Sequence, residues 1–145
     1  MKKTKYIPFA VLFSVILSIF SCSGYSQLED NEMFSFVIEP TLDEISVGER
    51  VTFVVKLTNL TNETIAFRHA LPLISFGIIS IDDETPWAKG TISIPETFPP
   101  NGYFERTLNI EPMEAGEFIV RAIASFRVGS REFGFEINHP LTVVE

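Results

Sequence analysis

The sequence of 145 residues is poor in the side chains that carry most chemistry: it has one cysteine, two histidines and one tryptophan. A single cysteine excludes a disulfide within the chain, so the fold must depend on its apolar core. Neither His69 nor His139 has a second His or Cys at the spacing of zinc ligands. No Gly-x-Ser-x-Gly motif is present, and the shortage of histidine leaves little for a catalytic triad. We therefore expect no enzyme activity, no cofactor and no metal site.

Basic residues are also few, with 11 Lys and Arg against 19 Asp and Glu, for a net charge of −8. Lys2, Lys3 and Lys5 belong to the N-terminal segment 1–21, and without that segment the remaining 124 residues carry a net charge of −11. A surface this acidic repels phosphate backbones and anionic lipid headgroups, so nucleic-acid binding is not expected. A chain of this length is sufficient for one domain with its own core but not for two.

The longest apolar run, Ile7 to Phe20, follows the three lysines and ends at small residues around Cys22. This layout is typical of a secretory signal, and the run is shorter than the roughly 20 residues of a transmembrane helix. The ending Ile19-Phe20-Ser21-Cys22 resembles bacterial lipoproteins, in which the cysteine receives a lipid. The resemblance implies a signal peptide over 1–21 and a membrane anchor on Cys22. It also implies a domain outside the cytoplasm, at the cell membrane or outer membrane. Ordinary secretion and an uncleaved anchor are the alternatives.

The rest of the chain divides at residue 34. Residues 22 to 33 are polar and acidic with little to bury, which predicts a flexible tether. Beyond it, apolar residues alternate with polar ones, as in Phe34 to Ile38, Val51 to Leu57 and Phe118 to Phe126. Such alternation buries one face of an antiparallel sheet and leaves the other in water.

Further strands and the turns between them follow from local composition. No stretch has apolar residues at helical spacing. About seven or eight short strands predict an all-β, immunoglobulin-like antiparallel β-sandwich over residues 34–145. The other expected strands are Thr64 to His69, Leu73 to Ile81 covered on both faces, Thr91 to Ile94, Tyr103 to Glu111, Phe133 to Ile137 and Leu141 to Val144. The expected turns are Ser46 to Arg50, Asn59 to Glu63, Pro99 to Gly102, Met113 to Gly116 and Gly129-Ser130.

Two segments, Gly48 to Ile65 and Pro100 to Ala122, carry a resemblance to known domains. The first looks like paired strands of bacterial immunoglobulin-like domains, and the second has their Pro-Gly turn and Gly-x-aromatic-x-Val pattern. A named family with this likeness is the bacterial intracellular proteinase inhibitors, also immunoglobulin-like. The resemblance implies the fold, and it leaves an alternative function open: inhibition of a protease through a loop such as Glu96 to Gly102.

Recognition in such sandwiches usually resides on loops, here Ser80 to Gly90 and Phe98 to Gly102. Trp87 is a candidate anchor for a partner, although it could instead fold over the end of the sandwich. Asp82-Asp83-Glu84 could hold calcium or could simply form a turn. The main hypothesis is a lipid-anchored binding or assembly module of the bacterial envelope, with an unknown envelope protein as partner. A sugar- or calcium-binding accessory domain is a further alternative. The predicted partner-binding residues are Trp87, Asp82, Asp83, Phe98 and Tyr103.

Overall fold

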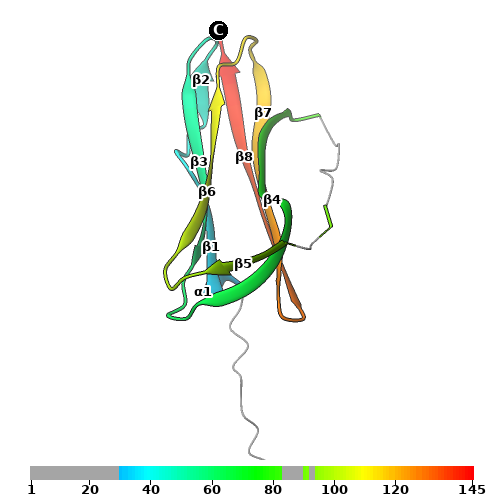
Figure 1. Ribbon diagram of the computed structural model, residues 1–145. Helices are drawn as coiled ribbons and strands as arrows, with labels where there is room; N and C mark the ends of the chain where they lie inside the picture. The colour runs from blue at the N-terminus through cyan, green and yellow to red at the C-terminus, as the bar shows by residue number, and fades with distance from the viewer. Residues whose placement is uncertain (1–29, 83–89, 92–93) are drawn as a thin grey trace, which may run out of the picture.

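The computed structural model describes residues 30–82, 90–91 and 94–145, and it folds them into strands with a single helical turn (Figure 1). In chain order the elements are α1 (Asp30–Met33), β1 (Phe34–Glu39), β2 (Glu44–Ser46), β3 (Val51–Asn59), β4 (Ile65–Ser80), β5 (Ile94–Phe98), β6 (Tyr103–Ile110), β7 (Gly116–Val128) and β8 (Arg131–Val144). No helix within the described ranges is long and apolar enough to cross a membrane.

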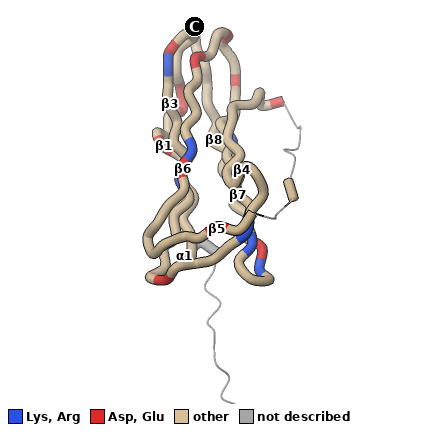
Figure 2. Tube along the Cα trace, viewed as in Figure 1, with Lys and Arg blue, Asp and Glu red and all other residues tan. Residues whose placement is uncertain are grey.

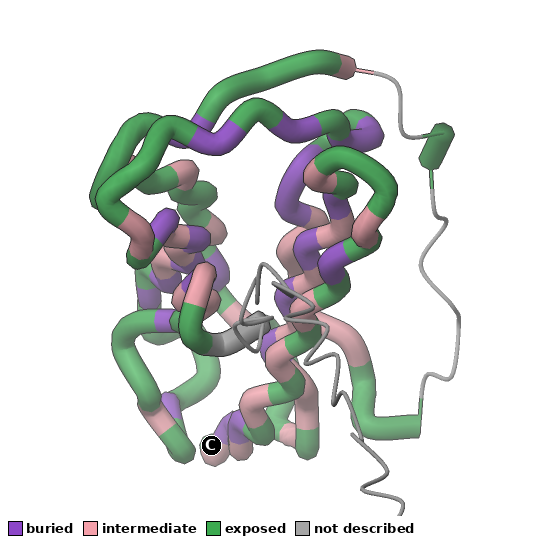
Figure 3. The backbone as a smooth tube through the Cα atoms, turned by 90° about the horizontal axis from the view of Figure 1, so that it is seen from below, coloured by how far each residue is buried: buried purple, intermediate pink, exposed green. Residues whose placement is uncertain are grey.

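The strands form two sheets, one of three strands in the order β1-β3-β6 and one of five in the order β2-β8-β7-β4-β5. In the view from below, the sheets are two layers joined at one side by β5 and the start of β4 (Figure 3). The predicted fold class is confirmed: the chain is an all-β, immunoglobulin-like sandwich. One pair departs from the antiparallel prediction, because β2 runs parallel to β8. The sequence reading missed β2, a strand of three residues whose Ile45 is buried.

The alternating segments form strands as predicted, and their apolar residues face the space between the sheets. In β3, the side chains of Val51, Phe53 and Val55 are buried, whereas Thr52 is exposed. In β7, Val120 and Phe126 are fully buried. Because side chains alternate along a strand, the apolar positions determine which face of each strand is buried.

β4 differs from the prediction of two strands, since one strand runs from Ile65 to Ser80. The sequence reading ended one strand at His69 and began the next at Leu73, with Pro72 between them, and proline lacks a backbone donor. In the structure the pairing with β7 shifts register between His69 and Ile74, so Pro72 lies in the irregularity and the strand continues. Residues 75–79, in the second half of β4, are only half-buried. The sequence reading expected this part of the strand to be covered on both faces, and that cover is incomplete.

β8 also continues through a proline at which the sequence reading interrupted it. Pro140 lies opposite Ile119 of β7. The amide of Thr142 donates to the carbonyl of Asp43, on the side away from β7, at 2.8 Å. Since backbone directions alternate, an amide at position 140 would also point away from β7. The proline therefore removes no bond from the β7 ladder.

Two boundaries shift relative to the sequence reading. The last four residues of the predicted tether are α1, where the carbonyl of Met33 accepts a hydrogen bond from the amide of Leu60 at 2.9 Å and its side chain packs on the core. The strand expected over Thr91 to Ile94 instead begins at Ile94 and continues to Phe98, and residues 92–93 lie outside the described ranges.

The core consists of two groups of buried side chains stacked along the sandwich. The lower group, near α1 and β5, is rich in phenylalanine, including Phe34, Phe98, Phe126 and Phe133. The upper group is mainly aliphatic and surrounds Phe53. Phe76 and Ile137 pack against both groups, which makes the interior continuous.

Candidate functional site

The structure places the predicted partner-binding residues at separate locations. Cys22, Asp83 and Trp87 lie outside the described residues, so their predicted roles stay predictions. Asp82 is exposed just beyond the end of β4. Tyr103 begins β6, close to the residues that pair with the start of β4. Most of the length of β4 separates these two residues, so they do not form one surface.

Phe98 is not a surface residue, and its predicted role in binding a partner is wrong. Its side chain is fully buried, with the ring stacked on Phe67 at 4.7 Å and edge-on to Phe104 at 4.8 Å. The sequence reading treated it as part of a projecting loop because Pro99 and Pro100 follow it. In the structure Phe98 ends β5 opposite Ile65, and this position points into the core.

Tyr103 is exposed, with 56% of its surface accessible, and the ammonium group of Lys56 lies 4.6 Å from the centre of its ring. A cation over a ring at this distance is a favourable contact of about 0.5 to 1 kcal/mol at an exposed site. The contact orders both side chains on the outer face of the three-stranded sheet, where Lys56 and Tyr103 lie on the adjacent strands β3 and β6.

If the protein were a protease inhibitor, it would present the segment Glu96 to Gly102 to the protease. In the structure this segment is part of the sandwich. Residues Glu96 to Phe98 belong to β5, and the turn that follows is closed by a 2.9 Å hydrogen bond from the amide of Gly102 to the carbonyl of Pro99. The side-chain amide of Asn59 also donates to the Pro99 carbonyl, at 3.0 Å. This segment is therefore a strand and a tight turn in place of the expected loop.

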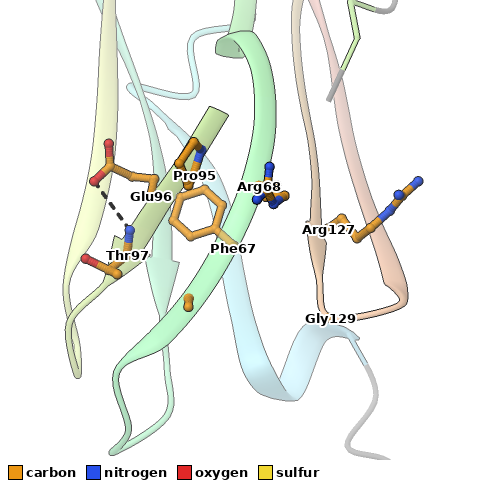
Figure 4. Close-up of a pocket in the computed structure, with 8 residues that line it drawn as sticks. Phe67, Arg68, Pro95, Glu96, Thr97, Arg127 and Gly129 are labelled. Atoms are coloured by element: carbon orange, nitrogen blue, oxygen red, sulfur yellow. Dashed lines mark hydrogen bonds between the residues drawn. The ribbon is translucent and has the colours of Figure 1, made fainter. Parts of the chain in front are cut away.

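A hollow of about 500 Å³ lies at the lower end of the five-stranded sheet (Figure 4). β4 contributes Phe67 and Arg68, β5 contributes Glu96 and Thr97, and Arg127 comes from the end of β7. Phe67 belongs to the core cluster, so the hollow has a rigid apolar base. Its polar groups are carried on strands, which hold side chains more firmly than loops do.

Two arginines on neighbouring strands are among the residues that line this hollow. Arg68 of β4 and Arg127 of β7 are direct partners in the register of the sheet. Like charges directly opposite each other disfavour the pairing, so an anionic group near them is stabilising. Glu132 of β8 forms an ion pair with Arg127. Arg131, in the adjoining hairpin, lies with its guanidinium carbon 4.8 Å from the centre of the Phe133 ring.

The basic character of this end contrasts with the acidic balance of the whole chain. In Figure 2 several basic residues, with an acidic one among them, lie where β5 and the hairpin between β7 and β8 meet. A guanidinium group is a planar fork of donors suited to carboxylate and phosphate. The hollow can therefore bind an acidic group of a partner. The position of Arg127 opposite Arg68 depends on strand order, which the local sequence does not indicate.

A ring nitrogen of each histidine contacts a backbone carbonyl. Nδ1 of His69 lies 2.6 Å from the carbonyl of Ala70, and the residue is buried. Nε2 of His139 lies 2.7 Å from the carbonyl of Leu42 and 3.9 Å from Asp43. Among residues 30–82, 90–91 and 94–145, no group of three or more His, Cys, Asp or Glu side chains could hold a metal ion. Neither histidine lines the arginine-bearing hollow.

One carboxyl has a shifted pKa. A hydrogen bond from Asn138 lowers the pKa of Glu136, and Arg121 lowers it further, whereas partial desolvation acts in the opposite direction. The Arg121 guanidinium donates to this carboxylate at 2.9 Å across β7 and β8. The group lies on the outer face of the sheet, away from the hollow, and its role there is to join the two strands.

No family model and no curated protein matches this chain. Solved structures do resemble it. The CARDB domain of PF1109 from Pyrococcus furiosus is 16% identical, with a TM-score of 0.46 over 77% of this chain and 94% of that domain. A PapD-like domain of human CEP192 is 10% identical, with a TM-score of 0.44 over 89% of this chain and 97% of that one. The complex of Zinc 2-glycoprotein and Prolactin inducible protein from human seminal plasma contains a chain that is 9% identical, with a TM-score of 0.44 over 78% and 94%. The likeness is one of fold.

Proposed function

We propose that this protein is a non-enzymatic binding module, held outside the cytoplasmic membrane of a bacterium by a lipid on Cys22. The observation that supports binding is the hollow lined by Arg68 and Arg127, which are register partners on neighbouring strands, beside the core residue Phe67. Its partner is an envelope protein that presents an acidic group. The layout of the N-terminal segment around Cys22 supports the anchor.

The arrangement of the sandwich indicates which end of the anchored domain would face the membrane. The described chain enters the fold at α1, at the same end of the molecule as β5 and the hairpin between β7 and β8 (Figure 1). Residues 22 to 29 span at most about 28 Å even when fully extended. An anchored protein would therefore hold the arginine-bearing hollow close to the membrane, within reach of another membrane-attached protein. The C-terminus would lie at the far end.

The anchor is tested by metabolic labelling with a fatty acid. We expect the wild-type protein to carry the label and to sediment with membranes, because at least two acyl chains give stable attachment. Cys22→Ser should lose the label and leave the membrane fraction. The control is Ser23→Ala, which alters the neighbouring residue and keeps the acceptor thiol. Labelling of Cys22→Ser at the wild-type level would contradict lipidation at this residue.

Recognition at the hollow is tested by crosslinking in intact cells. A photoreactive residue at Thr97, which is exposed and lines the hollow, should capture a partner. The same residue at Thr52, exposed on the other sheet, is the matched control. The combined change Arg68→Gln and Arg127→Gln should lower the Thr97 adduct at least about fivefold, since it removes both cations. Equal adducts from both positions, or an adduct insensitive to the arginines, would rule out the hollow as the site.

A further inference from the structure

β4 has a long stretch on which only one side is paired. β5 accompanies its first part, from Ile65 opposite Phe98 to His69 opposite Ile94. On the other side β7 pairs with β4 as far as Ser80. From Ile74 to Ser80, the side facing away from β7 therefore has no strand partner among the described residues. Figure 1 shows β5 crossing only the lower part of the molecule, while β4 continues upward.

Two contacts show which backbone groups face this edge. Just beyond β4, the amide of Ile81 donates to the carbonyl of Glu117 at 3.3 Å, next to the pair formed by Ser80 and Phe118. Antiparallel ladders alternate, so the odd-numbered residues of this stretch bond to β7 and the even-numbered ones point away. Independently, Nη1 of Arg106 donates to the carbonyl of Ile74 at 2.6 Å. Arg106 belongs to the other sheet, which confirms that an even-numbered carbonyl points outward.

Among the described residues, Arg106 thus occupies the first acceptor of the edge. The amides and carbonyls of Phe76, Ile78 and Ser80 follow in the same direction, and no described strand pairs with them. Unpaired donors and acceptors in a row are a template for another extended chain. Three such residues at a spacing of two accommodate a segment of roughly five to seven residues.

The side chains beside this edge are apolar and partly accessible. Phe76 and Ile78 are half-buried and pack against the core clusters. Above them, a hollow of about 410 Å³ is lined by Ile78, Ile110, Met113 and Phe118. Met113 is 77% exposed. A strand placed along β4 would direct alternate side chains into this space, where burial of apolar side chains favours binding.

The rim of the hollow is acidic, which restricts the partner. Glu114 is among its lining residues, and Asp82 lies exposed after the end of β4. Glu111 also lines it and is paired with Arg50 at 2.5 Å. A second copy of this chain bound at this edge would bring its own carboxylates toward these carboxylates, and the like charges would repel. The sequence that follows β4, Asp82-Asp83-Glu84, is acidic as well. A basic segment has the charge that complements this rim.

We propose that the edge of β4 from Phe76 to Ser80 binds an extended segment of another protein by strand addition. The segment has alternating apolar side chains and a lysine or arginine at its end. Backbone hydrogen bonds to Phe76, Ile78 and Ser80 give affinity, and the hollow at Met113 and Phe118 gives preference for an apolar side chain. This surface is separate from the arginine-bearing hollow and binds a segment of the opposite charge, so it does not depend on the function proposed above.

The probe is a fluorescent peptide, Lys-Thr-Val-Thr-Val-Thr-Val-Lys, added to the purified full-length protein. We expect saturable binding by anisotropy, and at least about tenfold weaker binding by the same peptide N-methylated at its valines, because methylation removes backbone donors. The peptide with glutamate at both ends should also bind more weakly.

Ser80→Pro removes a backbone amide that points away from β7, so it should keep the melting temperature and lose most of the peptide binding. Ser80→Ala retains the amide and is the matched control.

Amide hydrogen exchange tests the edge without any peptide. In the free protein the amides of Phe76 and Ile78 should exchange much faster than those of Ser75 and Gly77, which bond to β7. Added peptide should slow the two fast amides at least about tenfold. Protection of Phe76 and Ile78 in the free protein would show that the edge is already covered, by this chain or a second copy. That result, an absence of binding, or equal binding by Ser80→Pro would overturn the proposal.

Discussion

Replacing Asn59 by aspartate is expected to lower the free energy of unfolding by about 3 to 5 kcal/mol, although the change is a single atom. Asn59 is fully buried at the end of β3. Its amide nitrogen donates to the carbonyls of Glu63 and Pro99, at 2.9 and 3.0 Å. Its oxygen accepts from the backbone amide and the hydroxyl of Thr61, at 2.9 and 2.8 Å. The side chain therefore joins the turn after β3 to the turn before β6.

An aspartate keeps the two acceptor bonds of this network and loses both donor bonds. The carbonyls of Glu63 and Pro99 each lose one donor, although Pro99 keeps the bond from the Gly102 amide, and a buried carboxylate is placed against them without a cation. The destabilisation has a definite pH dependence. Burial and the neighbouring carbonyls raise the pKa of the introduced carboxyl above its unfolded value, so the cost of its charge is fully present above the folded pKa. As the pH falls toward the unfolded pKa, the carboxyl protonates, regains one donor, and the difference from wild type narrows.

Denaturant unfolding of Asn59→Asp and wild type at pH 7 and pH 4 measures both effects. Asn62→Asp is the matched control, since the same atom changes three residues away at an exposed position. We expect that control to stay within about 0.5 kcal/mol of wild type. A loss below about 1 kcal/mol for Asn59→Asp at pH 7, or a loss that grows as the pH falls, would contradict the role assigned to this amide.

Phe126→Ala is expected to cost about 3 to 5 kcal/mol and to lower the melting temperature by roughly 10 to 25 °C. Phe126 is fully buried in β7, at the centre of the lower core group. Its ring centre lies 5.0 Å from that of Phe34, nearly perpendicular, and 5.3 Å from that of Phe133 in a stacked arrangement. It also contacts Phe67 edge-on at 5.5 Å. Truncation removes all of these contacts and leaves a cavity between rigid strands.

Thermal unfolding followed by near-ultraviolet circular dichroism checks this expectation. Phe126→Leu restores much of the volume and should lose less than half as much stability as Phe126→Ala. Tyr103→Ala is the control for loss of an exposed aromatic ring, and it should cost no more than about 1 kcal/mol because its main contact is the exposed one with Lys56. Equal losses for Phe126→Ala and Tyr103→Ala would show that the lower group is not the main apolar core.

Phe126 and Asn59 show which features of the structure the local sequence predicts. Period-two alternation predicts that Phe126 faces inward, because side-chain direction in a strand depends only on position. The composition of Asn59 to Glu63 predicts a turn, and the bonds to Thr61 and Glu63 are local. The bond from Asn59 to Pro99 joins residues distant in the chain, and no local pattern indicates it.

The proposed binding surfaces likewise depend on tertiary structure that the local sequence does not predict. Sequence reading selected Phe98 because prolines follow it, but its burial depends on β5 pairing with the start of β4. It did not select Arg68, whose importance depends on Arg127 lying opposite in the next strand. The free edge of β4 arises because β5 is short and pairs only with the first part of its neighbour.

The sequence by itself determined that this chain is a β-sandwich, which face of each regular strand is buried, and where most of its turns lie. These properties follow from side-chain alternation and from the backbone preferences of Asn, Gly and Pro, which act over a few residues. Only the tertiary structure decided the order of the strands, the position of Arg68 opposite Arg127, and the edge of β4 that no described strand pairs with. Strand order and register are determined by packing between distant segments, and that free energy has no local signature.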